Sequence, residues 1–143
     1  MFSKACEYGI KASLFVAQRS ESPGKVRLQE IAKAISSPEA FTAKILQQLV
    51  KANIIHSRKG PNGGFYIELN ELPGIKLIDV VVAIDGDKIF HGCALGLEEC
   101  SEKSPCPVHE QFGIIRSSLK TMLENTSFAA LMSGLDSGLT FLK

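Results

Sequence analysis

Three cysteines and a histidine stand close together in the second half of the chain. Cys93, Cys100 and Cys106 lie in a glycine-containing stretch, and His109 follows three residues after the last of them. Thiolates and imidazoles are the side chains that hold iron–sulfur clusters and zinc in proteins. The gaps of six and five residues are wider than those of a zinc ribbon and suit a bulkier cluster. The pattern therefore predicts an iron–sulfur site, with [2Fe–2S] as the expected form.

The fourth ligand and the chemistry of the cysteines stay open at this point. His109 lies about one helical turn beyond Cys106, whereas Cys6 and Glu7 could reach the site from the first helix or from a partner subunit. Cys6 is better explained as a small buried apolar side chain. The same cysteines also suit zinc or a thiol switch that responds to oxidation. Two further alternatives are an iron–sulfur or thiol enzyme, disfavoured by the lack of a phosphate-binding glycine loop, and a protein-binding adaptor.

Three short helices are predicted ahead of the cysteines. Apolar residues recur at helical spacing from Ser3 to about Arg19, where Ser22-Pro23-Gly24 should end the helix, and again over residues 28–35. A third helix should begin with Ser37 as N-cap and Pro38 at its first position. Its predicted buried stripe consists of Phe41, Ile45 and Leu49.

A basic-tipped hairpin should follow the third helix. Strand-like runs at residues 54–59 and 65–69 flank a Gly/Pro/Asn cluster. Such a hairpin after a helix-turn-helix is typical of winged DNA-binding domains, whose third helix enters the major groove. Polar side chains can read base edges there, and a basic tip binds phosphates. The residues expected to contact double-stranded DNA are Thr42, Lys44, Gln47, Gln48, Arg58, Lys59, Gly60, Asn62 and Gly63.

The charge distribution agrees with a DNA-binding first half. The chain as a whole carries a net charge of +1, but residues 25–60 hold seven basic against two acidic side chains. Residues 61–143 hold six basic and eleven acidic side chains. A basic region in a nearly neutral protein fits one face that meets a polyanion. No apolar run is long enough to span a membrane, and we expect a cytoplasmic protein.

Apolar helices are predicted on both sides of the cysteine loop. Residues 77–84 form an apolar run that we interpret as a short helix, and residues 108–124 return to helical spacing. The apolar stripe of the second helix consists of Phe112, Ile115, Leu119 and Met122. Residues 127–143 are apolar enough to pack on another part of the molecule. The predicted fold is mainly α-helical with a small β-hairpin wing, a winged helix-turn-helix plus a long dimerisation helix.

Several segments resemble the Rrf-two family of bacterial transcription regulators, which includes an iron–sulfur cluster regulator and a nitric-oxide-sensitive repressor. The segments are S-K-A-C-E-Y-G-I-K-A, the wing R-K-G-P-N-G-G-F, the run I-K-L-I-D-V-V-V-A-I-D-G and the three-cysteine loop. The resemblance implies a homodimer that is held by the helix at 108–124 and reads a palindromic operator. It further implies that Cys93, Cys100 and Cys106 bind a cluster, with either His109 or Glu7 as fourth ligand.

We expect three parts in the chain. A winged helix-turn-helix domain should occupy residues 1–75, a linker helix and cysteine sensor loop residues 76–107, and a dimerisation helix with a C-terminal tail residues 108–143. The start of the third helix differs from the family pattern, so the resemblance implies no operator sequence.

Overall fold

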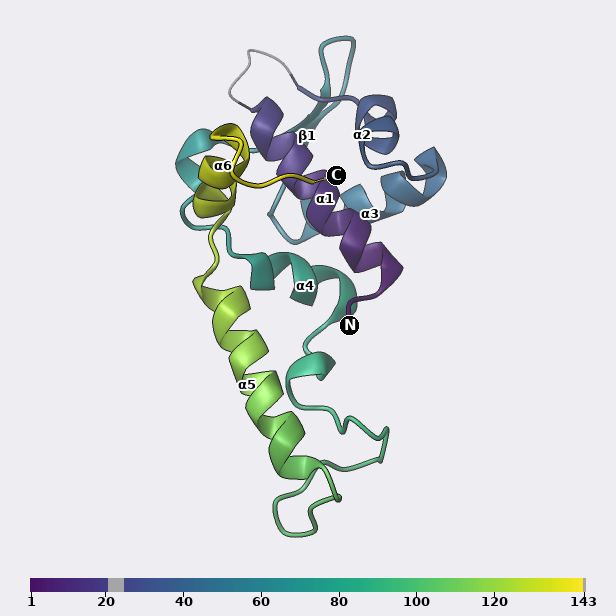
Figure 1. The fold of residues 1–143 in the computed structure, drawn as a ribbon. Coiled ribbons are helices and arrows are strands. Elements are labelled where there is room, and N and C mark those ends of the chain that lie inside the picture. Colours follow the sequence, from purple (N-terminus) through teal and green to yellow (C-terminus); the bar gives the residue numbers. More distant parts are fainter. Residues whose placement is uncertain (21–24, 143) are drawn as a thin grey trace.

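The computed structural model describes residues 1–20 and 25–142 and is mainly helical (Figure 1). Its helices and strands are α1 (Lys4–Arg19), α2 (Leu28–Ala34), α3 (Glu39–Lys51), β1 (His56–Arg58), β2 (Gly64–Tyr66), α4 (Leu77–Asp85), α5 (His109–Asn125) and α6 (Phe128–Asp136), with short 3-10 helices at Leu69–Glu71 and Lys88–Phe90. The predicted stop at Ser22, Pro23 and Gly24 lies outside the described residues. The predicted class, mainly helical with a small hairpin, is confirmed.

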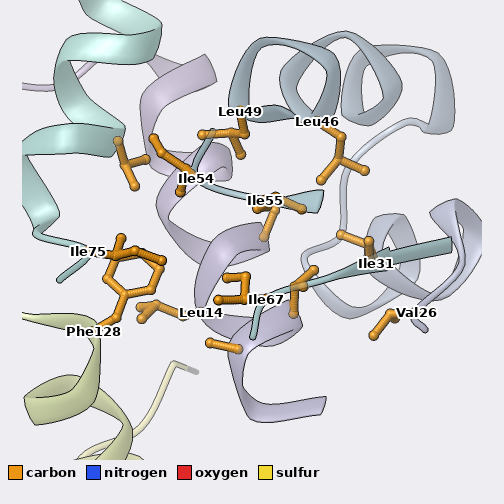
Figure 2. Close-up of a cluster of buried hydrophobic side chains, with 14 of the residues drawn as sticks. Leu14, Val26, Ile31, Leu46, Leu49, Ile54, Ile55, Ile67, Ile75 and Phe128 are labelled. Carbon is orange, nitrogen blue, oxygen red and sulfur yellow. The ribbon is translucent and has the colours of Figure 1, made fainter. Parts of the chain in front are cut away.

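A single apolar core joins the first three helices, the hairpin, α4 and α6 into a compact head. Figure 2 shows Leu14 of α1, Leu46 and Leu49 of α3, and Phe128 of α6 converging on this core. Phe128 is fully buried, and Met132 of α6 is 6% exposed. The expectation that the C-terminal segment packs on another part of the molecule is confirmed for α6, which contacts α1 within the head, whereas Leu139 and Phe141 beyond it are exposed.

The hairpin is attached to the head at its strands and near its tip. β1 and β2 pair antiparallel, with Ser57 opposite Phe65. Val26, ahead of α2, extends the pairing, since its N–H donates to the Phe65 carbonyl at 2.9 Å and its carbonyl accepts from the Phe65 N–H at 2.7 Å. Arg27 then donates from Nη2 to the Pro61 carbonyl in the turn, at 2.9 Å. The tip of the wing is therefore held in a fixed position beside α2.

The third helix begins one residue later than predicted. Pro38 is the N-cap and Glu39 the first helical residue, so the prediction of Ser37 as N-cap is wrong. Ser36 has a φ of +54° and turns the chain in the left-handed region just ahead of the helix. The Ser37 hydroxyl is buried without a hydrogen-bond partner. Among the described residues, no side chain caps the start of the helix, and the Pro38 carbonyl accepts a hydrogen bond from the Thr42 hydroxyl at 2.9 Å.

Helix α5 extends away from the head and carries the cysteine loop near its far end (Figure 1). The base of α5 is fixed to the start of α4 by two backbone hydrogen bonds. The Leu77 N–H donates to the Thr126 carbonyl, and the Phe128 N–H donates to the Ile75 carbonyl, both at 2.9 Å. Leu123 of α5 is fully buried beside α1 and α4. Among the described residues, no helix is long and apolar enough to cross a membrane.

Candidate sensor loop and nucleic-acid interface

The cysteine loop touches α5 through two side chains of that helix. His109 lies at the start of α5, and its Nδ1 is 3.5 Å from the sulfur of Cys100. Arg116, two turns further along the same face, donates from Nη2 to the Cys100 sulfur at 3.5 Å and from Nη1 to the Gly92 carbonyl at 2.5 Å. The structure thus places His109 beside Cys100, whereas its role as a ligand stays a prediction, and Arg116 is a contact that the sequence did not suggest.

Cys93 has the most clearly perturbed thiol of the loop. The backbone N–H groups of Leu97 and Leu95 bond to its sulfur and lower the pKa of Cys93 below its ordinary value. Desolvation opposes this shift, whereas a hydrogen bond with Cys106 and the charge of Arg116 add to it. Hydrogen bonds to the charged form favour that form. Cys93 is thus biased toward the thiolate, the form of cysteine that binds metals.

The donors are near one another without forming a finished metal site. In residues 1–20 and 25–142, no three His, Cys, Asp or Glu side chains are grouped closely enough to hold a metal ion. Cys93, Cys100 and Cys106 are all half-buried and outside any disulfide. Three thiols and an imidazole match an iron–sulfur centre in donor chemistry, so the residues fit the group in kind. They would have to move closer together to bind it.

The two candidate ligands on α1 lie in very different surroundings. Glu7 forms an exposed ion pair with Lys4, with 2.9 Å between Oε2 and Nζ, and this pair lowers the pKa of the Glu7 carboxyl. Cys6 is fully buried among apolar side chains that include Val81 and Leu123. Burial, with a smaller contribution from Asp85, raises the pKa of Cys6 to about 12. The interpretation of Cys6 as a buried apolar residue is confirmed.

Three of the four predicted DNA-reading residues on α3 are exposed. Lys44, Gln47 and Gln48 lie on the solvent face. Phe41, predicted to be buried, is 36% exposed at the edge of that face and packs edge-on against the ring of Tyr8. The solvent face of α3 therefore combines polar, basic and aromatic groups.

The prediction that Thr42 faces DNA is wrong. Thr42 is fully buried, and its hydroxyl is already bonded to the Pro38 carbonyl one turn earlier. A threonine can satisfy its hydroxyl in this way on the preceding turn and then pack like a small apolar residue. Leu46, which the predicted stripe omitted, is also fully buried. The inward face of α3 is therefore wider than the sequence pattern indicated.

The wing tip presents the predicted basic and small residues to solvent. Arg58, Lys59, Gly60 and Asn62 are exposed. Gly63 is required by the turn itself, because a Cβ there would lie 2.2 Å from the Arg58 carbonyl oxygen. The structure thus explains why a glycine occupies this position of the tip.

The predicted apolar stripe of α5 is divided between two surroundings. Phe112, Ile115 and Met122 are 38%, 54% and 48% exposed. Leu119 instead packs toward the small cluster around Cys6 in its own chain. Ile114, which the prediction missed, is 69% exposed. An open row of large apolar side chains on one helix is typical of a surface that meets another protein.

A family model described as an iron-dependent transcriptional regulator, Rrf2, matches residues 2–134. The chain belongs to the Rrf2 family. An Rrf2 chain is a DNA-binding regulator of transcription, and this one is therefore a regulator rather than an enzyme. The adaptor and enzyme alternatives are excluded by the same match.

Relatives and solved structures agree with this family. The chain is 28% identical over 135 residues to a protein of Aquifex aeolicus described as a helix-turn-helix transcriptional regulator, covering 93% of this chain and 92% of the relative. It is 24% identical to the regulator IscR of Aliivibrio salmonicida, over 87% of this chain and 73% of the relative. Two solved structures share the fold of this Rrf2 chain. These are CymR, the global cysteine regulator of B. subtilis (TM-score 0.75, 21% identity, 93% and 96% coverage), and IscR of T. potens (TM-score 0.75, 20% identity, 100% and 93% coverage).

Proposed function

We propose that this Rrf2 regulator is a homodimer whose binding to a palindromic operator is controlled by an iron–sulfur cluster in the cysteine loop, with [2Fe–2S] as the expected form. The observation that carries the proposal is the 3.5 Å contact between Cys100 and His109. It brings the middle cysteine of the loop to the first residue of α5, so one thiol and the imidazole lie side by side, and Cys93 and Cys106 would approach them when the cluster binds. The family description as iron-dependent supports the same interpretation.

Cys93, Cys100 and Cys106 would hold the cluster, with His109 as the fourth ligand. Cys93 is already biased toward the thiolate by the N–H groups of Leu97 and Leu95. Glu7 is the second candidate for the fourth position, but its carboxylate is engaged with Lys4 on α1. A bound cluster would supply redox chemistry and reactivity toward oxidants and nitric oxide. The protein's own part is to place its donors and to connect them to α5.

The open row on α5 would form the dimer contact. Phe112, Ile114, Ile115 and Met122 are exposed in the single chain, and burying their exposed parts against a second copy would contribute about 25 cal/mol per Å² of apolar surface. A two-fold dimer uses the same patch on both subunits, so one helix can supply the whole contact. Two heads would then read two half-sites with a fixed spacing.

In each head, Lys44, Gln47 and Gln48 of α3 would enter the major groove. Their exposure and their chemistry support this role, since Gln can pair with an adenine edge and Lys with guanine acceptors or phosphate. Arg58, Lys59, Gly60, Asn62 and Gly63 at the wing tip would follow the backbone. Since its target is genomic DNA, we place the regulator in the cytoplasm.

A change at the loop would reach DNA through α5. The loop contacts His109 and Arg116 on α5, and the base of α5 is bonded to the start of α4 in the head. Loss or oxidation of the cluster would release the loop and alter the tilt of α5, and with it the separation of the two α3 helices. A bias of about 1.4 kcal/mol between two such states changes operator affinity tenfold.

The first experiment is anaerobic purification, with visible absorption and with iron, sulfide and zinc analysis on one sample. Iron with acid-labile sulfide supports the cluster, and replacing His109 with Ala should then change the visible spectrum more than Glu7→Gln. A larger change in Glu7→Gln would transfer the fourth position to α1. Zinc, or no metal after anaerobic reconstitution, would replace the cluster with a zinc site or a thiol switch on the same cysteines.

The coupling to DNA is tested by Cys100→Ala. We expect this variant to bind operator with the same affinity whether or not it has been through reconstitution, whereas the affinity of the parent protein should differ between the two states. Equal operator affinities in the parent protein with and without cluster would contradict the regulatory role and leave the DNA-binding role intact.

A further inference from the structure

Arg116 makes the most extensive contact between the cysteine loop and the rest of the protein. Its guanidinium spans the loop, with one nitrogen on the Gly92 carbonyl at 2.5 Å and the other on the Cys100 sulfur at 3.5 Å. These partners lie eight residues apart at the entry and the middle of the loop. A planar guanidinium carries five N–H donors in a rigid fork, so one side chain can bind both partners at once.

The loop has few other attachments. Its backbone hydrogen bonds are short-range, such as Gly96 N–H to the Cys93 carbonyl and His109 N–H to the Cys106 carbonyl. In the part of the chain that the structure describes, the side-chain hydrogen bonds that join residues 92–108 to another element all end on α5, at His109 or Arg116. Within that same part, backbone bonds hold only the two ends of the loop, from the Gly92 N–H to the Lys88 carbonyl and from the Phe112 N–H to the Val108 carbonyl. Leu95 and Leu97 of the loop are more than half exposed and add little packing. The attachment of the middle of the loop, at Cys100, therefore depends on these two side chains.

The two side chains differ in what they can do. His109 is at the N-terminal end of α5 and is itself a candidate ligand. Arg116 lies in the middle of α5, where Leu119 and Leu123 follow on the same side of the helix and pack against the head. Arg116 is half-buried and thus partly protected from competing water. Arg116 therefore stands on a part of α5 that is held in place by the packing of Leu119 and Leu123 against the head.

We propose that Arg116 is a positioning residue that clasps the cysteine loop to α5 in the metal-free protein, by holding Gly92 and Cys100 in place together. The clasp keeps the Cys100 thiol next to His109. Its connection to sensing rests on the proposed function, but its existence does not, because its contacts are made by groups of this chain alone.

The test is amide hydrogen exchange of the metal-free full-length protein, followed by mass spectrometry of peptides that cover residues 92–108. Arg116→Gln removes the charge and part of the fork, and we expect loop amides to exchange at least about fivefold faster. Lys120→Gln, one turn further along α5 and exposed, is the matched control and should leave the loop unchanged. Equal loop exchange in Arg116→Gln and the parent protein would overturn the proposal.

Two further variants separate a clasp from a general effect on folding. Arg116→Lys retains the charge but cannot hold both partners in a fork, so it should restore part of the protection. Cys100→Ala removes one of the two partners. Cys100→Ala also removes the contact with His109, so the double variant should exchange faster than Arg116→Gln alone. If Arg116 acts through Cys100, its rate should still rise by less than the two single effects combined, because both substitutions remove the Arg116–Cys100 contact. Additive effects, or no rescue by Lys, would contradict the clasp.

The outcome stays distinguishable from that of the proposed function. A protein that never takes up iron can still show fast loop exchange in Arg116→Gln, which would retain the clasp and remove the cluster. If the protein takes up a full cluster but loop exchange in the metal-free Arg116→Gln variant is unchanged, the cluster is retained and the clasp is rejected.

Discussion

The head and the cysteine loop are held by different kinds of interaction. The head has a continuous apolar core to which α1, α3, α4, the hairpin and α6 all contribute (Figure 2). The loop has no regular secondary structure between Phe90 and His109 and is attached to α5 by hydrogen bonds of His109 and Arg116. Packing makes the head a stable reader of DNA, whereas the loop can change its arrangement at small cost in free energy. The difference suits the proposed mechanism, in which the cysteine loop moves while the DNA-binding head stays folded.

The largest effect should come from Phe128→Ala, which tests whether α6 is part of the head. Phe128 is fully buried in the core, and truncating a buried Phe costs about 3–5 kcal/mol of unfolding free energy. Urea unfolding followed by far-UV circular dichroism measures the change. Phe141→Ala, at a side chain that is 76% exposed, is the matched control and should change stability by less than about 0.5 kcal/mol. Equal effects of the two substitutions would show that α6 does not belong to the core.

Gly63→Ala should damage the wing and leave the sensor loop unaffected. The added Cβ would lie 2.2 Å from the Arg58 carbonyl oxygen, so the turn must open. We expect operator affinity to fall about tenfold, equivalent to about 1.4 kcal/mol, with unchanged exchange in residues 92–108. Gly113→Ala, in open space on α5, is the control and should bind operator normally. Normal operator affinity in Gly63→Ala would remove the wing from the interface.

A smaller effect is expected from Arg58→Ala at the wing. A phosphate contact adds affinity for any sequence, so binding should weaken on specific and nonspecific DNA alike, and the salt slope should fall by about one. Fluorescence anisotropy titrations at several salt concentrations measure both quantities. Lys120→Ala, outside the head, provides the comparison. An unchanged salt slope would mean that the Arg58 side chain does not meet phosphate.

The smallest effect is expected in the pH dependence of alkylation, which should differ between Cys93 in the loop and Cys6 in the core. Because the pKa of Cys93 is lowered, its thiolate fraction and its alkylation by iodoacetamide should rise at lower pH than in the urea-unfolded protein. Cys6, with a pKa of about 12, should stay unmodified in the folded protein near neutral pH. Peptide mapping by mass spectrometry measures both sites in metal-free protein. Identical pH midpoints for Cys93 in the folded and unfolded protein would contradict the role of the Leu97 and Leu95 amides.

The raised pKa of Cys6 makes the free energy of unfolding depend on pH, and the sign of this dependence is fixed. Because the pKa of Cys6 in the folded protein lies above its ordinary value of 9.0, the unfolded chain loses the thiol proton first. The contribution of Cys6 to the free energy of unfolding is therefore complete below pH 9 and is lost as the pH rises toward 12.

Periodic elements could be predicted from the sequence, and contacts between elements could not. The helix from Ser3 to Arg19 was placed within about one residue, because apolar spacing reports the buried face directly. The helix at 77–84 was also placed within about one residue, but its continuous apolar run suits a strand as well, and its position after the hairpin and Pro73-Gly74 favoured the helix. Thr42 was misplaced because its hydroxyl bonds to its own helix, so a polar residue type gave the wrong face. Arg116 was missed for a related reason. A lone arginine on an amphipathic helix resembles a solvated side chain, and its partners lie in a loop without periodicity.

The base of α5 has a mechanical consequence. Two backbone hydrogen bonds fix residues 126–128 to the start of α4, while the other end, at His109, is tied to the loop. The helix has 17 residues and is thus about 25 Å long. If α5 rotated as a rigid body about its C-terminal end at Thr126, its N-terminal end at His109 would move the furthest. A rotation of about 5° about Thr126 would move His109 by roughly 2 Å, comparable to the helix shifts of many allosteric proteins. In the proposed mechanism, a small displacement of the loop at His109 would therefore correspond to a small rotation of α5 at its base in the head.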